Sequence, residues 1–253
     1  MSSKYDSSYW LDQKFDYDQS YGLKKTLLLC STPRSGSHFL ASIIASIDYL
    51  GKPFEYFHES HLKVWKKDLE AKSVLDVIEY LIRKRTSPFG IFSVKAHWEQ
   101  LKWFNKKFPV PTKKLNLQNY LLIERKDLLE QAISLEIAFQ SKAFISMAEP
   151  VSVELNYSRR RINKHISQFQ AKYNEWEKYF NNKKIDPCRI NYEDLVMDPA
   201  LQLFRICEYM SLDISHDQAN EMIRIYNSQT DHAPKKQFSE VNLLWKEKYN
   251  SGS

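Results

Sequence analysis

The residues of this chain best suited to chemistry are an arginine and two serines in one short segment. Arg34, Ser35 and Ser37 lie in the sequence Thr-Pro-Arg-Ser-Gly-Ser-His, which ends at His38. Hydroxyl and guanidinium groups donate hydrogen bonds, and arginine offers two parallel donors that match the oxygens of a phosphate or a sulfate. The segment therefore predicts a binding site for one of these anions.

The elements on either side of the segment favour the same ligand. Residues 26–30 form an apolar run typical of a buried strand, and from residue 39 onward apolar residues recur at helical spacing. A strand, a short loop and a helix in this order direct the first N–H groups of the helix, and the positive end of its dipole, at one point. Pro33 and Gly36 are expected to complete this anion cradle. An ordinary polar turn is the alternative interpretation.

The segment differs from the P-loop of ATP-binding proteins. That motif, G-x-x-x-x-G-K-[ST], needs its lysine for the terminal phosphates and its hydroxyl for magnesium. Here the first glycine and the lysine are missing, and the basic residue, Arg34, stands two positions before Gly36. These absences count against a nucleotide-dependent phosphotransferase, which is the first alternative and which strict dependence on magnesium would reveal.

A second stretch, residues 118–141, supplies a further cation and a further hydroxyl. Arg125 follows an apolar run at 120–123, and Ser134 lies nine residues later within a helical pattern. A guanidinium together with a hydroxyl suits a dianion. The alternatives are a surface ion pair for Arg125 and a solvent-facing position for Ser134.

The same stretch predicts an amphipathic helix that begins at Asp127. Asp127 and Glu130 have the spacing of a capping box. We expect an apolar stripe made of Leu128, Ala132, Leu135 and Phe139. The opposite, polar face is expected to carry Glu130, Gln131, Ser134 and Ser141.

Three stretches in order resemble the sulfotransferase superfamily. The T-P-R-S-G-S segment resembles the loop that binds the 5′-phosphosulfate of 3′-phosphoadenosine 5′-phosphosulfate (PAPS), and the Arg125–Ser134 spacing resembles the pair that holds its 3′-phosphate. Tyr192, in a Tyr-Glu-Asp-Leu stretch before a helix start at Asp198-Pro199, corresponds to a residue near the adenine. A packed core tyrosine is its alternative.

This resemblance implies a fold and an activity. The implied fold class is α/β, a P-loop-like three-layer sandwich with a central, mostly parallel sheet flanked by helices. Strands are expected near residues 25–31, 91–95, 119–124 and 187–191. The implied activity is that of a PAPS-dependent sulfotransferase, which releases adenosine 3′,5′-bisphosphate (PAP) as its product.

Residues 51–57, with the pattern G-x-P-x-E-[FY]-F, are similar to bacterial carbohydrate sulfotransferases of the trehalose 2-sulfotransferase type. This similarity implies a carbohydrate or glycolipid-type acceptor and makes Glu55 the general base. The Lys95-x-His97 spacing is instead that of small-molecule sulfotransferases, whose base is the histidine. Glu55 is favoured because the residues around it match, and Lys95 and Arg34 are expected to stabilise negative charge during transfer. Some aromatic residues are candidates to stack on a sugar, although most are expected in the core: Tyr56, Phe57, Trp65, Trp98 and Trp103.

We expect one sulfotransferase domain over residues 1–253, with residues 1–22 as an N-terminal extension. Residues 228–253 are expected to form a loop and a helix that close the nucleotide site, where Lys235 and Lys236 face the 3′-phosphate unless they are simply solvated. A long helix is predicted over 152–181. Its heptad-like apolar seam is expected to pack inside the chain, and a homodimer contact is the alternative.

The composition limits the remaining possibilities. A net charge of +6 and a pI near 9.0 suit a polyanionic donor or a nucleic acid. The basic residues are dispersed and no nucleic-acid-binding motif accompanies them, which counts against nucleic acid. A non-catalytic module that binds a phosphorylated ligand or nucleic acid is the second alternative, and the two candidate bases weigh against it. Three cysteines without metal-ligand spacing predict no metal site. No signal peptide or membrane-spanning apolar run is found, which favours a cytoplasmic enzyme.

Overall fold

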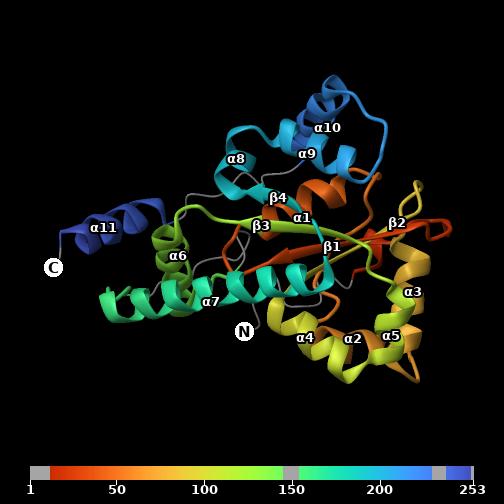
Figure 1. The fold of residues 1–253 in the computed structure, drawn as a ribbon, viewed down its shortest axis with the longest axis horizontal. Coiled ribbons are helices and arrows are strands. Elements are labelled where there is room, and N and C mark those ends of the chain that lie inside the picture. Colours follow the sequence, from red (N-terminus) through yellow and green to blue (C-terminus); the bar gives the residue numbers. More distant parts are fainter. Residues whose placement is uncertain (1–11, 145–153, 230–237, 252–253) are drawn as a thin grey trace.

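Four parallel strands form the centre of the protein, in the order β2-β1-β3-β4 (Figure 1). The structure, a computed structural model, describes residues 12–144, 154–229 and 238–251. The strands are β1 (Lys25–Ser31), β2 (Ile91–His97), β3 (Asn119–Glu124) and β4 (Cys188–Asn191). Each begins within one residue of its predicted position. Continuous apolar runs are typical of parallel strands that are covered on both faces, and these runs made the strands predictable.

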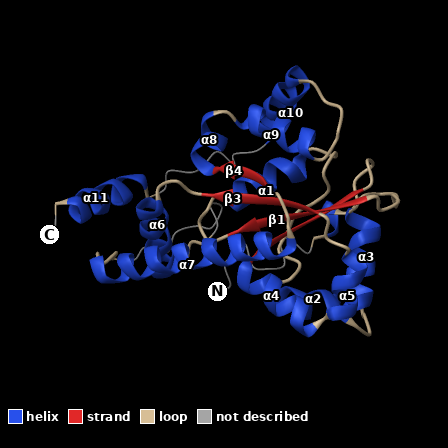
Figure 2. Ribbon diagram, viewed as in Figure 1, coloured by secondary structure: helices blue, strands red, loops and turns tan. Residues whose placement is uncertain are grey.

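Helices cover both faces of this sheet, which confirms the predicted α/β fold class (Figures 1 and 2). One face packs against α1 (Ser37–Ser46), α8 (Tyr192–Met197), α9 (Pro199–Tyr209) and α10 (His216–Gln229). The other packs against α2 (Glu59–Asp68), α3 (Val74–Arg85), α4 (Trp98–Lys107), α5 (Pro109–Leu115) and the second half of α7 (Arg159–Lys183). The first half of α7, α6 (Leu128–Ser141) and α11 (Ser239–Asn250) form a third cluster.

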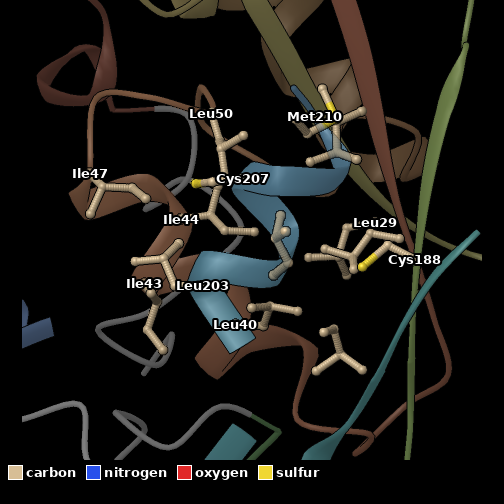
Figure 3. Packing of buried hydrophobic residues seen from close by; sticks show 14 of the residues in the cluster. Leu29, Leu40, Ile43, Ile44, Ile47, Leu50, Cys188, Leu203, Cys207 and Met210 are labelled. Carbon is tan, nitrogen blue, oxygen red and sulfur yellow. The ribbon is translucent and has the colours of Figure 1, made fainter. Parts of the chain in front are cut away.

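Side chains alternate between the two faces along β1, so that one strand serves both cores. Leu27 and Leu29 point to the face covered by α1 and α9, where Leu29 lies beside Cys188 (Figure 3) and in one cluster with Leu40 and Leu203. Leu28 and Cys30 belong to the opposite core. All residues of β1 after Lys25 are buried as a result, and the loop that follows the strand starts from a rigid support.

Helix α7 begins later than predicted. The side chain of Ser158 accepts a hydrogen bond from the backbone N–H of Arg161 and caps the helix, which starts at Arg159 rather than near residue 152. The predicted seam packs inside the chain. Ile162 and Phe169 are buried against α6, and Trp176 and Phe180 are buried in the core below the sheet. The other two seam residues, Ile166 and Tyr173, are half-buried beside α6.

A buried ion pair fastens the segment before β1 to the end of α3. The Arg85 side chain is fully buried, and its Nε donates to Oδ1 of Asp16 at 2.6 Å. The guanidinium carbon lies 5.8 Å and 5.9 Å from the ring centres of Phe54 and Tyr56. Because these two rings flank Glu55 in the sequence, the ion pair supports the segment that carries Glu55. Within the described ranges, no helix has the length and apolar character needed to span a membrane.

Candidate functional site

A cavity of about 1320 Å³ opens at the carboxyl ends of the strands. Residues that follow each of the four strands line it, together with parts of α6 and α11. In parallel α/β sheets this edge is the usual place for a ligand. The structure brings together here most of the residues predicted for the site: Pro33, Arg34, Gly36, Ser37, His38, Glu55, His97, Arg125, Ser134 and Tyr192.

The loop after β1 presents an uncapped helix start to the cavity. Gly36 is the N-cap of α1 and has φ = +87°, and among the described residues no side chain caps this helix. A Cβ atom at Gly36 would lie 2.1 Å from Cδ2 of Tyr192, so only glycine fits. The Ser35 hydroxyl is buried and has no hydrogen-bond partner in the described part of the chain. An anion at the helix start would find unpaired donors.

Two guanidinium groups lie next to this loop. Nε of Arg34 donates to Oγ of Ser134 at 3.0 Å, which joins the two predicted anion-binding segments. Burial and the neighbouring Arg125 lower the pKa of Arg34, so an anion between the two cations would relieve their repulsion. The Nε of Arg125 is buried without a hydrogen-bond partner among the described residues. Its Cζ lies 4.5 Å from the centre of the Tyr192 ring.

The capping box predicted at the start of α6 is only half formed. Oδ1 of Asp127 accepts a hydrogen bond from the backbone N–H of Glu130 at 2.9 Å, as expected. The Glu130 carboxylate instead accepts from Nη2 of Arg125 at 2.7 Å. The guanidinium attracts it more strongly than a neutral N–H would.

A short backbone contact places Glu55 beside Lys95. The backbone N–H of Lys95 donates to the carbonyl of Phe54 at 2.9 Å, and Phe54 forms a parallel bridge with Val94. The preceding turn approaches β2 closely, because a Cβ atom at Gly51 (φ = +80°) would lie 2.7 Å from the carbonyl oxygen of Ile91. Gly51 therefore lets the segment run along the edge of β2.

Glu55, Lys95 and His38 form one polar cluster at the cavity. Nζ of Lys95 lies 2.8 Å from Oε1 of Glu55 and 3.1 Å from Nε2 of His38. Burial raises the pKa of Glu55, but Lys95 and the two nearby histidines outweigh burial and hold this pKa well below its usual range. Burial and Lys95 lower the pKa of His38. At pH 7 the carboxyl group is therefore ionised and the His38 ring is neutral.

His97, the rival candidate base, ends β2 and caps α4. Its Nδ1 lies 2.9 Å from Oγ of Ser31, and its pKa is lowered mainly by burial. The side chain of Gln100 joins the two candidates: its Oε1 accepts from the backbone N–H of His97, and its Nε2 donates to Oε2 of Glu55, both at 2.8 Å. Both candidates are unprotonated at neutral pH and line one cavity.

Comparison with models of known protein families identifies the family of this chain. The model of the Stf0 sulphotransferase family matches residues 26–249. The chain belongs to the Stf0 sulphotransferase family. The predicted superfamily and enzyme class, a PAPS-dependent sulfotransferase, are thereby confirmed. A search of curated proteins finds no match.

Several solved structures of sulfotransferases are similar to the chain. Mouse sulfotransferase SULT7A1 complexed with PAP is 18% identical with a TM-score of 0.49, and the match covers 85% of this chain and 66% of the mouse chain. The chain thus spans about two thirds of the mouse enzyme. The sulfotransferase domain from the curacin biosynthetic pathway is 17% identical (TM-score 0.42, covering 77% and 76%), and that from the Synechococcus PCC 7002 olefin synthase is 15% identical (TM-score 0.44, covering 79% and 77%).

Within α6, three residues lie where the helical pattern did not predict them. Ser141, expected on the polar face, is buried, and its hydroxyl donates to the carbonyl of Ile137. Gln131, expected on the polar face, is fully buried, and its Nε2 donates to Oγ1 of Thr32 and to the carbonyl of Pro33, both at 2.8 Å. Phe139, expected in the apolar stripe, is 51% exposed and lines the cavity. Gln131 holds the loop after β1 from behind, a role that only the tertiary contact reveals.

The remaining predicted residues are placed as follows. Lys95 is buried behind the cavity wall and reaches it through Glu55 and His38. Lys235 and Lys236 lie outside the described residues. Another lysine from α11, Lys246, lines the cavity and pairs with Asp127. In the described ranges, no cluster of three or more His, Cys, Asp or Glu residues is arranged to hold a metal ion.

Proposed function

We propose that this protein transfers a sulfuryl group from PAPS to a hydroxyl group of a carbohydrate or glycolipid-type acceptor and releases PAP. The observation that carries the proposal is the pairing of two features in one cavity. An uncapped helix start with Arg34 and Arg125 lies at one side, and the ionised Glu55 with its Lys95 partner lies at the other. The first suits an anionic donor and the second suits activation of a hydroxyl.

The donor is bound through its two anionic ends. The N–H groups at the start of α1, with Arg34 and the hydroxyls of Ser35 and Ser37, hold the 5′-phosphosulfate. Arg125 and Ser134 hold the 3′-phosphate, and the Tyr192 ring lies against the adenine. When the donor binds, Arg34 replaces its hydrogen bond to Ser134 by one to the donor. Arg125 keeps its hydrogen bond to Glu130 and makes a further one to the donor.

The transfer itself needs a base and positive charge. Glu55 takes the proton of the acceptor hydroxyl, whose oxygen then forms a bond to sulfur while the bond from sulfur to the 5′-phosphate oxygen breaks. Lys95 and Arg34 stabilise the negative charge on the sulfonate and on the departing phosphate oxygen. These side chains supply the required charge without a metal ion.

Several finer points stay predictions. They are the identity of the base, the roles of Lys235 and Lys236, the single-domain organisation, the homodimer and the cytoplasmic location.

Calorimetric titration with PAP, ATP and 5′-AMP, each with and without magnesium, tests the proposal. We expect PAP to bind tightest and independently of magnesium. Arg34→Ala and Arg125→Ala should each weaken PAP binding about 10- to 100-fold, because each removes charge-assisted hydrogen bonds. Arg160→Ala, which changes an exposed arginine outside the cavity, is the control. Preference for ATP with magnesium, or no binding of PAP, would contradict the proposal.

A further inference from the structure

One wall of the cavity is apolar and comes from the end of α6 and the residues after it. We call residues 135–144 the α6 wall; the side chains that line the cavity are Leu135, Ile137, Ala138, Phe139, Ala143 and Phe144. The rings of Phe139 and Phe144 pack edge to face, with their centres 5.5 Å apart. They are nevertheless 51% and 44% exposed. Large exposed aromatic side chains on a cavity wall indicate that an apolar group covers them.

Arg34 makes hydrogen bonds at both ends of the α6 wall. Ser134, the residue before the wall, accepts a hydrogen bond from Nε of Arg34 at 3.0 Å, and the carbonyl of Phe144 accepts one from Nη1 at 2.6 Å. The wall therefore lies next to the guanidinium proposed to hold the phosphosulfate. Tyr192, the proposed partner of the adenine, packs instead on Gly36 and Arg125. Ser134, before the wall, is the hydroxyl proposed for the 3′-phosphate, so it is the far end of the wall, at Phe144, that lies beside the guanidinium proposed for the sulfonate end of the donor, where an acceptor must bind.

The rest of the cavity shows why a free sugar would be a poor match for this wall. The five aromatic residues considered for sugar stacking all pack in the core below the sheet, and none lines the cavity. The polar lining residues nearest the candidate bases are Glu55, His97 and Gln100, whereas Arg34, Arg125 and Ser134 belong to the proposed donor site. At about 1320 Å³, the cavity is larger than a typical single-ligand site of up to about 1,000 Å³, so it has room for a second molecule beside the donor.

We propose that the acceptor is an amphiphile: its hydroxyl-bearing polar head reaches Glu55, and its hydrocarbon part lies against the α6 wall. This inference rests on the proposed function and narrows its acceptor class to glycosides or alcohols with an apolar tail. A small unsubstituted sugar would leave the Phe139 and Phe144 rings in water.

Binding of a matched pair of glycosides to the PAP-saturated protein tests the inference. Octyl β-glucoside, kept below its micelle-forming concentration, and methyl β-glucoside share one head group and differ only in the tail. We expect the octyl compound to bind about 30-fold or more tighter in calorimetry, with one molecule per chain, because several methylene groups leave water. Phe139→Ser and Phe144→Ser should each remove about 5-fold or more of this preference. Phe89→Ser, which changes a comparably exposed phenylalanine (42%) outside the cavity, should leave it unchanged.

The outcomes separate this inference from the proposed function. If PAP binds but the two glycosides bind equally, or neither binds, the amphiphilic acceptor is wrong and the donor site stands. If Phe89→Ser lowers the preference as much as the two wall variants, the tail binds elsewhere and the inference also fails. If PAP itself does not bind, the proposed function fails first.

Discussion

Replacing Gln100 with glutamate would place a second carboxyl group against Glu55 without changing the shape of the side chain. The backbone N–H of His97 is only a donor, so it must face Oε1 of Gln100, and this leaves Nε2 to donate to Glu55. In Gln100→Glu one carboxylate oxygen still accepts from His97. The other lies where Nε2 stood, 2.8 Å from Oε2 of Glu55 in the native protein.

The expected effect is a loss of stability that depends on pH. Two carboxylates at this distance share a proton, which raises one of their pKa values by about 1–2 units once the neighbouring Lys95 has offset part of the repulsion. In the native protein the pKa of Glu55 lies well below its usual range, so this group does not titrate between pH 5 and 8. A pKa that is raised in the folded state means that stability is retained below the unfolded pKa of about 4.3 and is lost as pH rises through the folded pKa. Gln100→Glu should therefore lose about 1.5–3 kcal/mol between about pH 4.5 and pH 6.5.

Thermal unfolding at pH 5 and pH 8 measures this loss without an acceptor. For a chain of this size, the difference in Tm between native protein and Gln100→Glu should be about 3–10 °C larger at pH 8 than at pH 5. Gln100→Leu is the control, because it removes both hydrogen bonds without adding charge and should destabilise equally at both values. A Gln100→Glu deficit that is the same at pH 5 and pH 8 would refute the contact between Gln100 and Glu55.

Two further substitutions test the loop and the base. Gly36→Ala should lower Tm by about 5 °C or more and weaken PAP binding about 10-fold or more, since its Cβ must displace the Tyr192 ring and φ is +87°; Gly22→Ala, with no atom within 4 Å of its Cβ, should do neither, and a normal Gly36→Ala protein would contradict the packing. Glu55→Gln and His97→Ala should differ strongly in transfer of labelled sulfuryl from PAPS, with a drop of about 100-fold or more at the true base. Equal, mild losses in both would remove both residues from that role.

The sequence predicted the strands and the anion-binding loop because both depend on local pattern. An apolar run such as residues 26–30, followed by a polar loop and a helical repeat, has few other ways to fold. Even the late start of α7 has a local cause, since Ser158 is a standard N-cap residue.

The contacts around the loop and the base could not be predicted in this way. Gln131 is buried because the loop after β1 brings Thr32 to it, and Gln100 bridges two segments because the turn before α2 brings Glu55 to it. Helical periodicity identifies both glutamines only as polar residues. Phe139 fits an apolar stripe by spacing, but the helix extends beyond the core and leaves the ring at the cavity. Side-chain pairing across distant segments decides such positions, and local pattern carries no signal for it.

The ion pair between Arg85 and Asp16 has a practical consequence for anyone who shortens this chain. The family match starts at residue 26, and β1 starts at Lys25, so a truncation there would look harmless. It would remove Asp16 and leave a fully buried guanidinium without its carboxylate, a change that typically costs about 3–5 kcal/mol. Phe54 and Tyr56 rest on that guanidinium and flank Glu55. A shortened protein could therefore keep its donor loop and still misplace its base, so expression designs should retain the residues from Asp12 onward.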